Sequence, residues 1–184
     1  HSMNKTPEMV WLKVRSHSNG GFIVGHKDLD GGTAPWTHFL ALNNSDAEGD
    51  LNTIFNDTAP TSTHLTLGTS SWVNYDAREY ISMLFTSTSV SKVGSYTGTG
   101  STQTITTGFQ PRFAIIKRVN SAQHWYVFDT TRGWASGNDQ YIKLDLTDAQ
   151  AAADLGQPIS TGFQVGSDPT VGASGDKYIY YCHA

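Results

Sequence analysis

The chain has 184 residues, of which 38% are hydrophobic and 15% charged, and its formal net charge is −4. Its 12 lysines and arginines are scattered, which argues against a nucleic-acid partner because phosphate contacts need clustered basic residues. No apolar run approaches the roughly 20 residues of a membrane-spanning helix, so we expect no membrane insertion. The single cysteine, Cys182, excludes an intramolecular disulfide and a cysteine-based zinc cluster.

Many short strands joined by turns are expected from the 18 glycines and the abundant serine, threonine and asparagine. We set aside residues 1–3 as the remnant of an expression tag. The first predicted strand follows Pro7 and alternates, with Val10, Leu12 and Val14 on one face. After a turn at residues 16–21, further strands of the first half are predicted at residues 22–24, 39–42, 65–68 and 80–85.

The second half begins after a short polar connection at residues 86–91. Two strands are predicted around the turn Gly98-Thr99-Gly100, as an opening hairpin. Residues 147–155 alone have helix character, with Thr147 as N-cap, and we expect one short turn of helix there. The remaining strands are predicted at residues 113–117, 125–128, 141–144, 163–166 and 178–183.

The two halves repeat one pattern. The proline-led apolar run from Pro7 to Lys13 recurs from Pro111 to Lys117, about 100 residues later. Three further blocks align in the same order: residues 38–43 with 140–145, 65–68 with 163–166, and 80–85 with 178–183. We therefore predict a tandem duplication of one β unit, with repeat 1 at residues 4–88 and repeat 2 at residues 89–184.

Repeat 1 lacks the opening hairpin that precedes Pro111 in repeat 2. Either this copy has lost the hairpin, or the sequence begins inside a repeat of a longer chain. Because exposed sheet edges are a liability, we expect the edge of its sheet to be completed by another subunit or by residues outside this sequence.

Several motifs resemble those of a protein family from marine phage genomes, in which tail and other virion proteins carry lectin-like, concanavalin-like repeats. The resemblance implies an all-β fold, an antiparallel β-sandwich of jelly-roll type, together with a location in the virion and an adhesive or structural role. The motifs span almost the whole chain: Gly94-Ser95-Tyr96-Thr97-Gly98-Thr99-Gly100, Gly108-Phe109-Gln110-Pro111, residues 56–62 (Asn-Asp-Thr-Ala-Pro-Thr-Ser), Leu67-Gly68 and residues 178–182.

Aromatic residues in turn-rich segments are the candidate ligand-binding residues. These are Trp36, Trp72 and Trp134, with Tyr75 and Asn138 in the same kinds of segment. Sugar rings stack on exposed aromatic faces while amides and carboxylates take their hydroxyls, so this pattern favours a glycan site. Trp36 and Trp134 occupy corresponding loops of the two halves. The alternative is that each loop tryptophan folds back as a lid over a small core.

A calcium site is the metal hypothesis. Asp46, Glu48 and Asp50 place acidic oxygens at alternating positions in a glycine-containing loop, which suits a hard cation. The stretch does not complete an EF-hand loop, and a solvated acidic loop is the alternative. No other cofactor is expected.

We predict that the chain is a phage tail or fibre component that forms a homo-oligomer and attaches to a host-surface glycan. A purely structural decoration or spacer protein, in contact with other virion proteins, is the first alternative. A polysaccharide-degrading enzyme is the second, but a glycosidase needs two carboxylates across a cleft. The glutamates Glu8, Glu48 and Glu79 form no alternating cluster and most aspartates lie in turns, so we expect no enzymatic activity.

Overall fold

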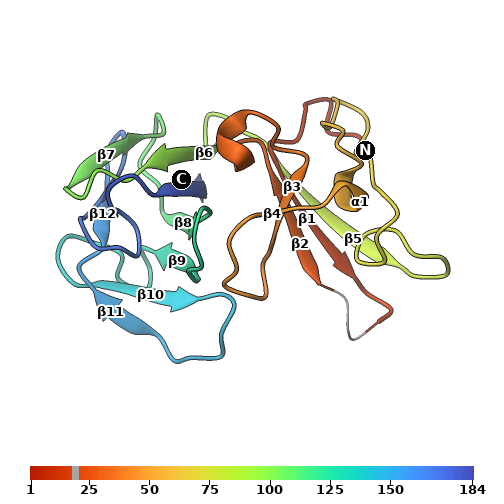
Figure 1. Ribbon diagram of the computed structural model, residues 1–184. Helices are drawn as coiled ribbons and strands as arrows, with labels where there is room; N and C mark the ends of the chain where they lie inside the picture. Colours follow the sequence, from red (N-terminus) through yellow and green to blue (C-terminus); the bar gives the residue numbers. More distant parts are fainter. Residues whose placement is uncertain (18–20) are drawn as a thin grey trace. The chain divides into compact units, whose positions relative to one another are not determined.

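The computed structural model describes residues 1–17 and 21–184 and confirms an all-β fold with antiparallel sheets (Figure 1). The chain forms two compact units. Unit 1 comprises residues 1–43 and 48–86, and unit 2 comprises residues 44–47 and 87–184. The division falls between Thr86 and Ser87, whereas the sequence analysis placed a repeat boundary between residues 88 and 89. The turn predicted at residues 16–21 includes residues 18–20, which lie outside the described part of the chain.

Unit 1 is built on one five-stranded antiparallel sheet. Its strands, in spatial order, are β4 (Gly49–Asp50), β3 (His38–Ala41), β2 (Phe22–His26), β1 (Met9–Val14) and β5 (Tyr80–Phe85). Two short helical segments, η1 (Leu29–Gly32) and α1 (Asn52–Phe55), lie in the connections. The predicted apolar face of β1 is buried, because alternate side chains of a strand share a face. The core of the unit contains Val10, Leu12, Ile23, Trp36, Ile54, Phe55 and Val73.

Unit 2 has two antiparallel sheets around one core. The larger sheet has the order β11 (Ala151–Ala153), β10 (Asp139–Lys143), β9 (Trp125–Asp129), β8 (Phe113–Arg118), β14 (Lys177–His183) and β6 (Ser91–Thr97). The smaller sheet has the order β12 (Gly156–Ile159), β13 (Gly162–Val165) and β7 (Gln103–Thr106). Phe163 of the smaller sheet and Tyr178 of the larger belong to the same buried cluster, so the two sheets pack as in a sandwich.

The two units share a strand order and a set of hydrogen bonds. The order β3-β2-β1-β5 in unit 1 matches β10-β9-β8-β14 in unit 2. The first tyrosine of the last strand, Tyr80 or Tyr178, accepts one backbone N–H and donates to one backbone carbonyl of the preceding loop, each at 3.0 Å. Asn43 accepts the N–H of the first residue of β2, and Asp145 accepts the N–H of the first residue of β9, both at 3.1 Å. These contacts occur at positions that the sequence blocks align.

Residues 147–155 are not helical, so the sequence prediction is wrong there. Residues 151–153 form the edge strand β11, which pairs with β10 from Asp139↔Ala153 to Tyr141↔Ala151. Alanine favours a helix by well under a kilocalorie per residue, and pairing with a neighbouring strand outweighs this preference. The α-helix of the described residues lies instead at α1, in the other unit.

Both strands of the predicted opening hairpin exist, but they do not pair with each other. β6 pairs with β14 in the larger sheet, and β7 pairs with β13 in the smaller one. The turn between them is bound to another loop, since Gly98 donates to the Asp176 carbonyl and Gly100 to the Gly172 carbonyl, both at 2.8 Å. The chain therefore crosses from one sheet to the other at this turn.

Residues 65–68 were predicted as a strand, yet they are not one, whereas residues 163–165 of the aligned block 163–166 lie in β13. β13 is paired on both sides, with β12 and with β7. In the described part of unit 1 neither partner strand has a counterpart. The same local pattern therefore stays irregular, because a strand needs a neighbour to satisfy its backbone.

Candidate functional site

Trp36 and Trp134 are buried in the structure. Their exposed fractions are 7% and 3%, so the expectation of exposed indole faces in these loops is wrong. Trp36 packs edge-on against Phe55 with ring centroids 5.2 Å apart, and Trp134 lies against Phe128 at 5.6 Å. Removing an indole from water is favourable, so each loop folds its tryptophan over the core of its own unit.

Trp72 and Tyr75 are exposed, with fractions of 40% and 53%. They lie in residues 70–78 of unit 1, which we call the aromatic loop. Asn74 and Asp76 of the same loop are exposed as well. Within five residues the chain therefore presents two aromatic rings, an amide and a carboxylate to solvent.

Hydrogen bonds and one buried side chain hold the aromatic loop in place. The Ser70 carbonyl accepts the Val73 N–H at 3.1 Å, and the Val73 side chain is buried in the core. The Tyr80 hydroxyl accepts the Tyr75 N–H and donates to the Ser71 carbonyl, both at 3.0 Å. A loop that is already ordered loses little conformational entropy when it binds a ligand.

Arg78 and Phe39 flank the two exposed rings. The Arg78 guanidinium carbon lies 4.3 Å from the centroid of the Tyr75 ring, within cation–π range. The Trp72 ring lies 5.9 Å from Phe39, tilted by 57°. Flat apolar rings beside a guanidinium, an amide and a carboxylate can stack on a sugar ring and bond its hydroxyls.

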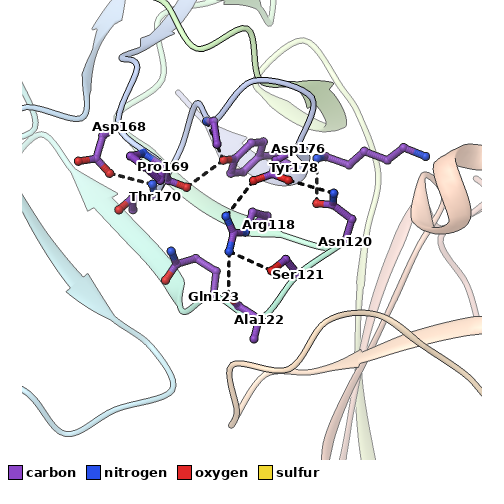
Figure 2. Close-up of polar contacts among 12 residues, drawn as sticks. Arg118, Asn120, Ser121, Ala122, Gln123, Asp168, Pro169, Thr170, Asp176 and Tyr178 are labelled. Carbon is purple, nitrogen blue, oxygen red and sulfur yellow. Dashed lines mark hydrogen bonds and ion pairs between the residues drawn. The ribbon is translucent and has the colours of Figure 1, made fainter.

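The corresponding loop of unit 2, residues 168–176, contains no aromatic residue. It is held by the same pair of tyrosine hydrogen bonds as the aromatic loop (Figure 2). Tyr178 accepts the Ala173 N–H and donates to the Pro169 carbonyl. Burial raises the pKa of Tyr178, so its hydroxyl stays protonated and able to donate. At the positions of the two exposed rings this loop has Thr170 and Ala173.

Arg118 is the centre of a polar network beside that loop, and Figure 2 shows its guanidinium pointing toward Asp176. It donates to the Asp176 carboxylate at 2.8 Å, and to the Ser121 hydroxyl and the Ala122 carbonyl at 3.1 Å. Asn120 donates to the other Asp176 oxygen at 3.1 Å. Because these groups bond one another, the network joins β8 and its following turn to the start of β14 and serves the fold.

Asn138 lies in the loop between β9 and β10 and is exposed. Its neighbour Asp139 is fully buried and holds this loop in place. The Asp139 carboxylate accepts the N–H groups of Leu155 and Gly156 at 2.8 Å and of Ala135 at 3.3 Å. Burial raises the pKa of Asp139, and the three backbone donors oppose that shift. Sequence reasoning missed this residue because aspartate in a glycine-rich segment is typical of an ordinary turn.

A polar pocket of about 250 Å³ lies beside this loop in unit 2. Gln157 and Gln164 line it from paired positions of β12 and β13, and their side chains are hydrogen-bonded at 2.7 Å. The rest of the lining comprises Thr102, Ser136, Asp154, Val165 and three glycines, Gly137, Gly156 and Gly166. No sequence motif marks the pocket, because four separate segments contribute to it.

The predicted calcium ligands do not converge. Asp46 accepts the Asn44 side-chain amide at 2.8 Å, while Glu48 accepts the Asp30 N–H at 2.7 Å. Asp50 lies in β4, opposite His38. Within residues 1–17 and 21–184, no three His, Cys, Asp or Glu side chains form a group that could hold a metal ion. The three carboxylates of the acidic stretch therefore have different surroundings, and the spacing of these residues in the sequence does not show where their side chains lie.

Cys182 and His124 carry side chains of types that can react, but both contact neighbouring residues of the fold. Cys182 is fully buried, and burial raises the pKa of its thiol to about 12, far from that of a nucleophilic cysteine. His124 Nδ1 lies 2.7 Å from the Asp145 carboxylate, which also accepts the Trp125 N–H.

None of the helices in the described residues is long and apolar enough to cross a membrane.

One family model matches the chain, and it covers residues 1–184. No curated protein and no solved structure matches. The family is described as a domain of unknown function, DUF7483, and the match leaves no part of the sequence outside it. The chain therefore belongs to the DUF7483 family.

Proposed function

We propose that this chain is a phage virion component, in a tail or fibre, that attaches to a host-surface glycan without enzymatic activity. In this proposal it consists of two tandem homologous repeats of the lectin-like sandwich type. The matching strand orders and the matching hydrogen bonds of Tyr80 and Tyr178 support the duplication. The resemblance of the sequence motifs to phage virion repeats supports the location.

The aromatic loop carries the glycan-binding part of the proposal. Trp72 and Tyr75 are exposed on an ordered loop, next to exposed polar side chains. The corresponding loop of unit 2, residues 168–176, has neither ring. Clustered exposed aromatic side chains usually mark an interaction surface. A single such site binds a sugar weakly, and a homo-oligomer would multiply the contacts with a repetitive glycan surface.

A glycan array and a host-polysaccharide binding assay test this function. Trp72→Ala and Tyr75→Ala are each expected to weaken binding about tenfold, which corresponds to about 1.4 kcal/mol. Leu146→Ala is the matched control, because Leu146 is also 40% exposed but lies in unit 2 outside the aromatic loop. Both rings are at the surface, so circular dichroism should show unchanged folding.

The assay is run with calcium and with a chelator. Binding that disappears in chelator would support a calcium site at Asp46, Glu48 and Asp50. Binding that survives both aromatic substitutions would refute the aromatic loop as the binding surface. In that case Gln157→Ala and Gln164→Ala would test the polar pocket of unit 2.

A structural decoration or spacer is the second candidate. The observation that favours it is the edge position of β5 in the unit 1 sheet, since edge strands readily pair with other chains. It predicts that no saccharide binds under any condition and that the chain associates stably with another virion protein.

A further inference from the structure

An apolar groove of about 420 Å³ lies along β5, which Figure 1 shows beside β1. Its lining belongs to unit 1 and comprises Leu12, Leu65, Leu67, Tyr80, Ser82 and Leu84, together with His1, Thr63 and His64. Among residues 1–17 and 21–184, no strand pairs with the outer edge of β5, the edge away from β1. A strand edge beside an apolar groove is the arrangement that accepts an added β-strand.

The corresponding face of unit 2 is closed. The residues of β13 and β14 that align with the groove lining are at most 4% exposed, namely Phe163, Val165, Tyr178, Tyr180 and Cys182. In unit 1, Ser82 is exposed, and three leucines and the tyrosine of the lining are only partly buried. The groove is therefore a part of the core surface that stays uncovered in unit 1.

β6 and β7 provide the cover in unit 2. Tyr96 of β6 stacks on Tyr178 with ring centroids 5.0 Å apart and planes 10° apart, and its hydroxyl donates to the Val171 carbonyl at 2.8 Å. Ile105 of β7 lies in the same core. β6 pairs antiparallel with β14 along the whole of that strand. The cover is thus an antiparallel strand that places one tyrosine on the first tyrosine of the last strand.

Unit 1 retains the groups that such a strand contacts, with one informative difference. Tyr80 aligns with Tyr178, and the loop before it has the same hydrogen bonds. Ser82, however, aligns with Tyr180, whose ring lies so close to Gly94 of β6 that an added Cβ would be 2.6 Å from the Tyr180 hydroxyl. Because serine is much smaller than tyrosine, a strand that fits unit 1 can carry a large side chain where β6 has glycine.

We propose that the groove and the outer edge of β5 bind one extended strand of a partner protein. The strand runs antiparallel to β5, with an aromatic residue over Tyr80 and a large apolar residue two positions earlier over Ser82. β6 of a second copy of this chain is not the donor, because it is bound to β14 and its release would expose the core of unit 2. This site is distinct from the glycan surface of the aromatic loop.

A synthetic peptide of residues 89–107 that carries Gly94→Leu tests the proposal. The substituted peptide cannot replace β6 in unit 2, because the added side chain would meet Tyr180, so its binding reports on unit 1. We expect calorimetry to show binding to the full chain and hydrogen exchange to show protection of residues 80–85. A second change in the peptide, Tyr96→Ala, should weaken binding at least about tenfold, because it removes the aromatic anchor.

Two protein variants supply the control. Ser82→Glu places a charge in the groove at an exposed position and should abolish peptide binding without unfolding the chain. Ser101→Glu makes the same change at an exposed serine of unit 2 and should leave binding intact. Absence of peptide binding would overturn the proposal, as would protection of residues 177–183 instead of 80–85. Self-association that protects β5 without peptide would also overturn it, because a second copy would then fill the groove.

Discussion

Removing one hydroxyl from each unit should have unequal effects, although the two hydroxyls make the same pair of hydrogen bonds. Tyr178→Phe deletes the acceptor of the Ala173 N–H and the donor to the Pro169 carbonyl, and Tyr80→Phe deletes the matching contacts of Tyr75 and Ser71. Tyr178 has an exposed fraction of 0%. Tyr80 is only partly buried and lines the open groove. Water can therefore replace the lost hydroxyl more easily in unit 1 than in unit 2.

The magnitude follows from the groups left without partners. A fully buried donor or acceptor that loses its partner costs about 1–3 kcal/mol. The two hydrogen bonds of the Tyr178 hydroxyl are partly buried, so Tyr178→Phe should lower the free energy of unfolding by about 2 kcal/mol. Tyr80→Phe exchanges its bonds for bonds to water and should cost about 1 kcal/mol. Urea unfolding measures each loss, and amide hydrogen exchange at Ala173 and Tyr75 assigns it to a unit. Equal losses in the two variants would refute the argument from solvent access.

Three further predictions concern buried or strained groups. Asp139→Ala should lower the free energy of unfolding by about 3 kcal/mol, because three backbone N–H groups lose their acceptor, and Asp139→Asn should cost less since one oxygen remains; urea unfolding compares them. Burial raises the pKa of Cys182 from 9.0 to about 12, so the stability from its protonated thiol is complete below pH 9 and falls as the pH rises towards 12. A thiol reagent at pH 8 should accordingly react with Cys182 only after denaturation. Ala77 has a φ of +58°, where the aligned Gly175 has +82°. Ala77→Gly should therefore raise the free energy of unfolding and Gly175→Ala should lower it, each by about 1 kcal/mol or less. Calorimetry would show the sign of each change as a shift of the thermal midpoint.

The strands could be predicted wherever a side-chain pattern is both local and strong. The run from Met9 to Val14 alternates, and the closing run from Tyr178 is rich in β-branched and aromatic residues, so each indicates a strand without knowledge of its neighbours. β11 could not be predicted, because its alanines favour a helix and the decisive contacts come from β10 and from the Asp139 carboxylate. Pairing between distant segments is the information that a local pattern lacks.

The candidate site was predictable only in part, since loop tryptophans look alike in sequence. Trp134 is followed by Ala135, Ser136 and Gly137, so the indole is the large apolar group that this loop can bury. In the aromatic loop Val73 is buried instead, and the rings on either side of it remain at the surface. The difference depends on which side chain fits the core beneath the loop, and sequence spacing does not specify that fit.

Tyr80 connects the two proposed sites of unit 1. Its ring lines the groove, and its hydroxyl holds the aromatic loop through Ser71 and Tyr75. A strand that covers the ring would exclude water from these hydrogen bonds and so strengthen the hold on the loop that presents Trp72. Coupling between two binding sites is reciprocal, so a saccharide that favours the ordered loop would also favour the docked strand. In unit 2 the same tyrosine position is already covered by Tyr96, and the loop that it holds carries no exposed ring. The proposed strand docking and the proposed glycan binding therefore concern the same half of the chain, the one whose core surface is still open.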